Sequence, residues 1–158
     1  FEPGLTVRRK KPSARYRLKE KLDGGCLCGK IRFRIDGKSF GSGQCYCPDC
    51  RKTCGGGPAN GFVVTRDSLT LLKGKPKSYT SKTHAGGKST RQFCGDCGTP
   101  LFGSKDSSPG TIAVMVGALD DDADFRPQAI SWAGTAPEWA HLDDSLPRFE
   151  KDIVSRQE

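Results

Sequence analysis

Eight cysteines, arranged in three short groups, constrain this chain of 158 residues more than any other feature. The groups are Cys26 and Cys28, then Cys45, Cys47, Cys50 and Cys54, then Cys94 and Cys97. A disulfide framework would require cysteines separated by a single residue to diverge toward distant partners. A metal ion requires no such divergence, because closely spaced thiolates reach one ion from a single turn of backbone. The spacing therefore favours zinc over disulfides, and it favours a reducing compartment, the cytoplasm.

The cysteines can share metal ions in two ways. The pair Cys26/Cys28 can join either Cys94/Cys97 or Cys45/Cys47, and the closure entropies of the two loops differ by only about 1.2 kcal/mol. A structural zinc ion contributes on the order of 10–16 kcal/mol, so loop length does not decide between them. Local geometry favours the first, because Cys45, Cys47 and Cys50 lie close enough in sequence to form a three-thiolate site unaided. Two zinc ions follow: a closed four-cysteine structural site, and a three-cysteine site with the open position that is typical of catalysis.

Cys54 leaves two alternatives open at the middle group. If its thiolate joins the same ion, the site becomes a second closed four-cysteine site and the protein a zinc scaffold. If it stays off the ion, the site keeps room for an exogenous thiolate, and Cys54 becomes a candidate catalytic thiol. Arg51 and Lys52 would then hold an anionic substrate, or they form a solvated surface pair. Trp139 could close one wall of the same pocket, although such a residue is often a loop anchor.

Charge and hydropathy argue against nucleic-acid binding and against membrane association. The formal net charge is +8, and residues 1–21 hold eight Lys and Arg residues against two Glu residues. A basic arm on a nearly neutral body is typical of a solvated tail, so nucleic acid is not the expected partner. No stretch approaches the roughly 18 apolar residues that a membrane-spanning helix needs, so no membrane association is expected.

The rest of the chain predicts a mainly β fold, because Gly and Pro are frequent and apolar runs are short. We expect a basic arm at 1–21, a zinc-binding domain at 22–150 and a tail at 151–158. One helical turn is expected at 48–53, behind the cysteines, and His84 and His141 are expected on the surface. The predicted strands are 30–35, 62–65, 69–72, 77–81, 89–93, 100–102 and 111–116, the last of them central and buried.

Three ordered motifs carry a resemblance to a known family. They are GGCLCG at 24–29, CYCPDCRK at 45–52 and RQFCGDCGT at 91–99, followed by Leu119-Asp120 and by Ala136-Pro137 near Trp139. Over about residues 22–150 the chain resembles the glutathione-dependent formaldehyde-activating enzyme (GFA) family, which includes the centromere protein V relatives.

The resemblance implies an Mss4-like fold of several small antiparallel sheets stabilised by zinc. It implies a structural zinc ion on Cys26, Cys28, Cys94 and Cys97, and a second zinc ion on Cys45, Cys47 and Cys50 where glutathione binds. The implied activity is that of a carbon–sulfur lyase that condenses formaldehyde with glutathione to S-(hydroxymethyl)glutathione.

The sequence departs from the family pattern at three positions. Cys54 stands where a small residue is expected, Ile130 where relatives often have His, and Glu138 separates Pro137 from Trp139. Two other hypotheses therefore accompany the enzyme: a non-catalytic zinc-stabilised module whose basic arm contacts nucleic acid or other polyanions, and a redox sensor in which Cys54 switches between metal and disulfide.

Overall fold

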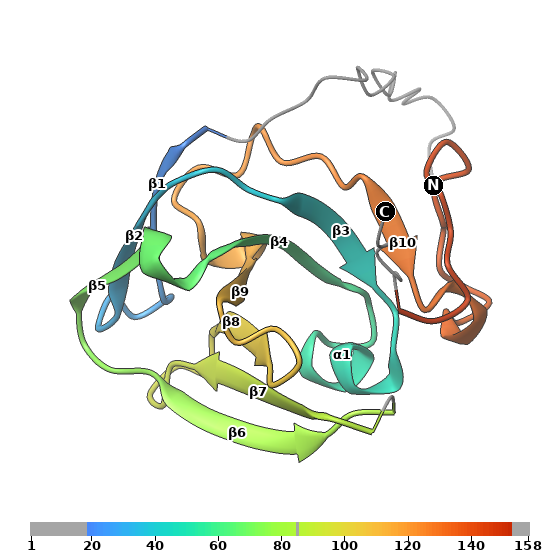
Figure 1. Cartoon of the computed structure of the whole chain (residues 1–158), viewed down its shortest axis with the longest axis horizontal. Helices are drawn as coiled ribbons and strands as arrows, with labels where there is room; N and C mark the ends of the chain where they lie inside the picture. Colours follow the sequence, from blue (N-terminus) through green and yellow to red (C-terminus); the bar gives the residue numbers. More distant parts are fainter. Residues whose placement is uncertain (1–18, 85, 153–158) are drawn as a thin grey trace, which may run out of the picture.

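The computed structural model of the chain describes residues 19–84 and 86–152. These residues form ten strands, one helix (α1, Pro48–Thr53) and three short 3₁₀ turns (Figure 1). The strands are β1 (Lys21–Gly25), β2 (Arg32–Asp36), β3 (Gly41–Cys45), β4 (Ala59–Thr65), β5 (Leu69–Lys73), β6 (Lys77–Lys82), β7 (Lys88–Phe93), β8 (Pro100–Lys105), β9 (Thr111–Met115) and β10 (Ala129–Ser131). The 3₁₀ turns are η1 (Arg66–Ser68), η2 (Val116–Ala118) and η3 (Ala133–Thr135).

The strands form two sheets. The smaller sheet is antiparallel in the order β1-β2-β5, and its middle strand alternates buried and solvated side chains as the period-two pattern predicts. The larger sheet has the order β10-β3-β4-β9-β8-β7-β6 and is antiparallel except at one edge, where β10 and β3 run parallel. The predicted central strand is confirmed, since β9 lies between β4 and β8.

The main core lies between the two sheets. Phe33 of β2 packs edge-on against Phe102 of β8, with ring centroids 4.9 Å apart. Buried side chains of β4 and β9, among them Phe62, Val64 and Val114, complete this cluster. The two sheets are therefore held together by apolar burial, the dominant favourable contribution to folding.

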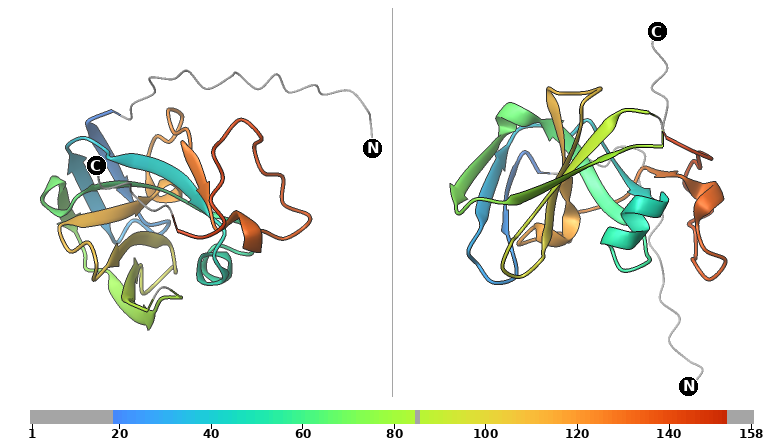
Figure 2. Two further views of the ribbon diagram at one scale, coloured as in Figure 1. Left: turned by 45° about the vertical axis from the view of Figure 1, so that its right-hand side comes forward. Right: turned by 90° about the horizontal axis from the view of Figure 1, so that it is seen from below.

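A second, smaller apolar cluster lies beside β10. Tyr46, Ile130 and Leu146 are its buried members. The segment after η3 folds back on β10, where Phe149 donates its N–H to the carbonyl of Ile130 at 2.9 Å. This packing places the segment that follows β10 next to α1 (Figure 2).

The mainly β prediction is confirmed, and the arrangement in several sheets is consistent with an Mss4-like fold. The helical turn expected at 48–53 coincides with α1. The strands β1, β3 and β10 were not predicted, and β10 pairs with β3 in parallel where antiparallel sheets were expected. The predicted arm and tail fall mostly on residues 1–18 and 153–158, which lie outside the described residues. Within the described part, no helix is long and apolar enough to cross a membrane.

Candidate metal centres

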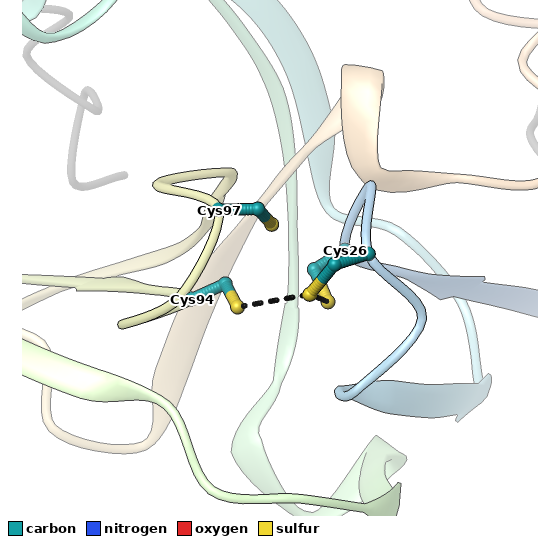
Figure 3. A group of neighbouring side chains, drawn as sticks. Cys26, Cys94 and Cys97 are labelled. Atoms are coloured by element: carbon teal, nitrogen blue, oxygen red, sulfur yellow. Dashed lines mark hydrogen bonds between the residues drawn. The ribbon is translucent and has the colours of Figure 1, made fainter.

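The outer cysteine pairs come together from two turns that belong to different sheets. Cys26 and Cys28 lie in the turn between β1 and β2, and Cys94 and Cys97 lie in the turn between β7 and β8. Their four sulfur atoms all lie within 4.8 Å of one another. Figure 3 shows the side chains of Cys26, Cys94 and Cys97 directed toward one another from the two turns. We call these four residues the outer cluster.

The two turns of the outer cluster have the same construction. Gly29 donates its N–H to the carbonyl of Cys26 at 3.0 Å, and Gly98 donates to Cys94 at 2.9 Å. Both glycines have positive φ angles, 73° and 74°, which other residues adopt only with strain. The N–H of Ile31 also donates to Cys26 Sγ at 3.2 Å. Each glycine thus lets the backbone wrap around a cysteine and turn toward the shared centre.

Sulfur distances in the outer cluster fit a metal ion. The Sγ atoms of Cys26 and Cys28 are 3.5 Å apart, and those of Cys28 and Cys94 are 3.7 Å apart. A tetrahedral zinc ion with Zn–S bonds of about 2.3 Å separates its sulfur ligands by about 3.8 Å. A disulfide would bring two sulfurs to about 2.05 Å, and all eight cysteines are free thiols. These two distances are close to that separation, so the outer cluster could hold a metal ion.

A hydroxyl group favours the charged form of one outer ligand. Thr99 Oγ1 lies 3.1 Å from Cys97 Sγ. This hydrogen bond, with support from backbone N–H groups, lowers the pKa of Cys97 to about 5. The thiolate that a metal ion requires is thus stabilised before metal binds.

The middle cysteines form a second, three-membered set, which we call the middle cluster. Cys45 ends β3, Cys47 caps the N-terminus of α1, and Cys50 lies within that helix. Their sulfur atoms lie within 4.8 Å of one another, and the N–H of Cys50 donates to Cys47 Sγ at 3.4 Å. The middle cluster therefore offers three sulfur ligands from one strand end and one helix.

Within the middle cluster, the pKa values of Cys45 and Cys50 are shifted in opposite directions. Hydrogen bonds from the thiols of Cys47 and Cys50 lower the pKa of Cys45 to about 3. The hydrogen bond that Cys50 makes to Cys45 in turn raises the pKa of Cys50. Three adjacent thiolates repel one another, so a cation is needed to hold all three in the charged form.

Cys54 lies outside the set of sulfurs that meet at the middle cluster. It forms the C-terminal cap of α1, and its nearest recorded side-chain partner is Thr53 Oγ1 at 3.8 Å. Cys54 therefore lies apart from the three sulfurs that could hold a metal ion together.

The other predicted site residues, Arg51, Lys52 and Trp139, lie in or near α1 but have different surroundings. Arg51 Nη1 donates to the carbonyl of Thr135 at 2.9 Å, while its buried Nε has no hydrogen-bond partner among the described residues. Lys52 is exposed. Trp139 is 66% exposed and lies beside the glycine loop after α1, since a Cβ placed on Gly56 would be 3.7 Å from its ring. Arg51 therefore lies within α1 and contacts η3, whereas Trp139 lies beside the loop that follows the helix.

Sequence reasoning missed a group of polar residues next to α1. Asp49 Oδ2 lies 3.5 Å from Arg91 Nη2 of β7, and Asp49 Oδ1 lies 3.9 Å from His84 Nε2. The His84 ring in turn lies 5.6 Å from that of Trp132, centroid to centroid. Both Asp49 and Arg91 fall within the quoted cysteine motifs, but nothing in the sequence pairs them.

Comparison with known proteins identifies the family. The sequence profile of the family described as glutathione-dependent formaldehyde-activating enzyme matches residues 21–135, which include both clusters. The chain belongs to this family. A curated relative from Halomonas elongata, whose name provisionally designates it a glutathione-dependent formaldehyde-activating enzyme, is 28% identical over 130 residues. The alignment covers 77% of this chain and 81% of that protein.

A crystal structure of a Rhodobacter sphaeroides protein resembles the fold of this GFA family member. The TM-score is 0.52 at 21% sequence identity, and the match covers 63% of this chain and 88% of that one. At this identity the likeness concerns the fold alone. Family membership and geometry together establish that two cysteine clusters of a GFA domain could hold metal ions.

Proposed function

We propose that this protein is a zinc-dependent carbon–sulfur lyase that joins glutathione to formaldehyde, giving S-(hydroxymethyl)glutathione, and cleaves that adduct in reverse. The observation that carries the proposal is the middle cluster, in which three sulfurs meet while Cys54 remains outside. Three protein ligands leave one tetrahedral position for a substrate, whereas four would close the site. Membership of the GFA family supports glutathione as the thiol.

The donor set of both clusters suits zinc. Thiolate sulfur is a preferred zinc ligand, and the free thiols imply a reducing compartment, for which we propose the cytoplasm. The outer cluster would hold a structural ion, and Cys45, Cys47 and Cys50 would hold the catalytic one. When bound there, zinc lowers the pKa of a coordinated thiol, so that glutathione is present as its nucleophilic thiolate at neutral pH.

The chain's own residues bind and orient the substrate. Glutathione carries two carboxylates, and Arg51 and Lys52 supply positive charge directly after Cys50. The unpaired Nε–H of Arg51 supports this role, because an unsatisfied buried donor costs about 1–3 kcal/mol that a carboxylate acceptor would relieve. The exposed ring of Trp139 would cover one side of the peptide.

Little further catalysis is required, because formaldehyde is a strong electrophile. Attack forms the S–C bond, the carbonyl π pair moves to oxygen, and a proton from water or from the Cys54 thiol completes the hydroxymethyl group. Orientation of the two reactants therefore contributes most of the acceleration.

Metal analysis combined with glutathione titration tests the proposal. Wild-type protein should contain two zinc ions per chain, bind one glutathione by calorimetry and accelerate exchange between ¹³C-formaldehyde and its glutathione adduct in NMR spectra. Cys47→Ser should keep one zinc ion and lose glutathione binding and exchange. Lys88→Gln, a matched change on the exposed surface of β7, should behave as wild type.

Two results would defeat the enzyme proposal. One is a protein with two zinc ions that binds no glutathione. The other is salt-sensitive binding to DNA that disappears when residues 1–18 are removed, without any thiol binding, which identifies the non-catalytic binding module instead.

A further inference from the structure

Helix α1 carries two of the three middle-cluster ligands but has almost no packing to hold it. It is six residues long, and none of its residues is buried. An isolated helix of this length is not stable in water, so contacts with other elements must fix its position. The meeting of Cys47 and Cys50 with Cys45 of β3 therefore depends on whatever anchors the helix from outside.

Asp49, which lies between these two ligands, provides one anchor. Its Oδ2 lies 3.5 Å from Nη2 of Arg91 on β7, and the two side chains are only 34% and 20% exposed. The other end of the guanidinium, Nη1, donates to Ser81 Oγ of β6 at 3.2 Å. Because Arg91 is fixed by β6 as well as by α1, pairing with Asp49 costs it little side-chain entropy, unlike a freely exposed ion pair.

Contacts on the other side of the helix complete the arrangement. Arg51 Nη1 donates to the carbonyl of Thr135 in η3, so α1 is tied to the β6–β7 hairpin on one side and to η3 on the other (Figure 1). His84 approaches the same carboxylate, with Nε2 3.9 Å from Asp49 Oδ1. Asp49 is thus the point at which the hairpin contacts the ligand-bearing helix.

The strand that supplies Arg91 is itself anchored. β7 ends at Phe93, and the next residue is Cys94 of the outer cluster. The outer cluster therefore holds the strand from which Arg91 reaches α1. Through Arg91, this anchored strand helps to fix the position of α1, which the short helix could not hold by itself.

We propose that Arg91 is a positioning residue for the middle metal centre: through Asp49 it sets α1 so that Cys47 and Cys50 meet Cys45. The inference rests on the metal-binding part of the proposed function and does not require glutathione. Partners that orient metal ligands typically change metal affinity by 10- to 100-fold when removed. The Arg91–Asp49 pair orients the whole helix that carries two ligands.

Metal titration of the full chain tests the proposal without measuring activity. Wild type, Arg91→Gln, Asp49→Asn and the double variant are titrated with Co²⁺, whose thiolate absorption bands report the number of bound sulfurs, and zinc affinities are measured against a chromophoric chelator. Each single variant should weaken the middle cluster about 10-fold and leave the outer cluster unchanged. The double variant should lose no more than either single one, because the two residues act as one unit. Lys88→Gln, on the same strand, should match wild type.

The proposal is overturned if both single variants bind metal at the middle cluster as tightly as wild type. It is also overturned if metal affinity falls equally at both clusters and the melting temperature falls as well, because that result would indicate a general loss of structure. Arg91→Lys, which keeps the charge but not the two-ended geometry, should recover part of the lost affinity. Wild type that binds both metals but no glutathione would defeat the proposed enzyme and leave the role of Arg91 intact.

Discussion

The two cysteine clusters use the same ligand atom but differ in how the fold presents it. The outer cluster joins two turns from different sheets, and two of its members, Cys26 and Cys94, are buried. The middle cluster joins a strand end to a short helix with no buried residue. The outer cluster therefore lies between turns of the two sheets, whereas the middle cluster lies at the end of a single strand, β3.

The same thiolate ligand can serve either stability or exchange, depending on how many sulfurs meet at the metal site. Four sulfurs close a metal site and add their binding free energy to folding, while three leave a position for exchange. Backbone hydrogen bonds and left-handed glycines shape the outer turns, whereas two side chains of α1 contact other elements: Asp49 pairs with Arg91, and Arg51 donates to the carbonyl of Thr135. Backbone hydrogen bonds thus shape the proposed closed site, and side-chain contacts support the helix of the proposed open one.

Removing one ligand from each cluster should give the largest contrast in stability. A structural zinc ion supplies on the order of 10–16 kcal/mol, which equals or exceeds the total stability of an ordinary domain. Cys94→Ser should therefore lower the melting temperature by at least about 15 °C or leave the domain unfolded. Cys47→Ser should lower it by less than about 5 °C, because none of the residues of α1 is buried. Circular dichroism melts with zinc analysis measure both.

Cys54→Ser serves as the control for that comparison, since its sulfur lies outside both clusters. It should leave the melting temperature and both zinc ions unchanged. Equal destabilisation by Cys94→Ser and Cys47→Ser would remove the distinction between a structural and an exchangeable site.

Acid should release the two metals in separate steps. Protons compete with metal for thiolates, so affinity falls as pH falls, and the site with fewer protein thiolates should empty first. We expect the middle cluster to lose zinc at a pH higher by about one unit, measured as chelator absorbance during acid titration. In Cys47→Ser only the lower-pH step should remain. A single step for both ions in wild type would contradict this order.

Local spacing predicted which cysteines act together within each turn, but it left open whether Cys54 joins the middle cluster. Cys26 and Cys28 lie in one turn, as do Cys94 and Cys97, so each pair presents its sulfurs together whatever the rest of the chain does. The helical turn after Cys47 could also be predicted from local sequence, because a proline such as Pro48 suits the first position of a helix.

Contacts between distant segments could not be predicted from spacing. Arg91 and Asp49 come from separate motifs, and Arg51 finds the carbonyl of Thr135 across 84 positions of sequence. Ile130, expected from the sequence to depart from the family pattern, is completely buried in a cluster with Tyr46 and Leu146. Its place in an apolar cluster depends on the return of the C-terminal segment, which no local pattern indicates.

An ion pair beside the outer cluster should show the smallest effect. Asp120 binds Arg32 of β2 through both carboxylate oxygens, with Nη1 to Oδ1 at 2.8 Å, and so links the smaller sheet to the segment that follows η2. Both side chains are more than a third exposed, so solvent screening leaves a contribution of about 0.5 kcal/mol. Asp120→Asn should lower the free energy of unfolding by that amount at pH 7, measured by urea denaturation, whereas Asp67→Asn on the exposed η1 turn should not.

The contribution of this ion pair to stability is better measured against salt concentration than against pH. Arg32 lowers the pKa of Asp120 below its ordinary value of 3.8, so the stabilisation is complete above that pH and is lost as the pH falls further. Acid would release metal from the clusters over the same range, which would hide so small a change. Salt is the better variable, because roughly 1 M NaCl shortens the screening length to about 3 Å and should reduce the difference between Asp120→Asn and wild type. A difference that persists at high salt would mean that Asp120 acts through packing and not through charge, and the contrast between a metal link and an electrostatic link would then fail.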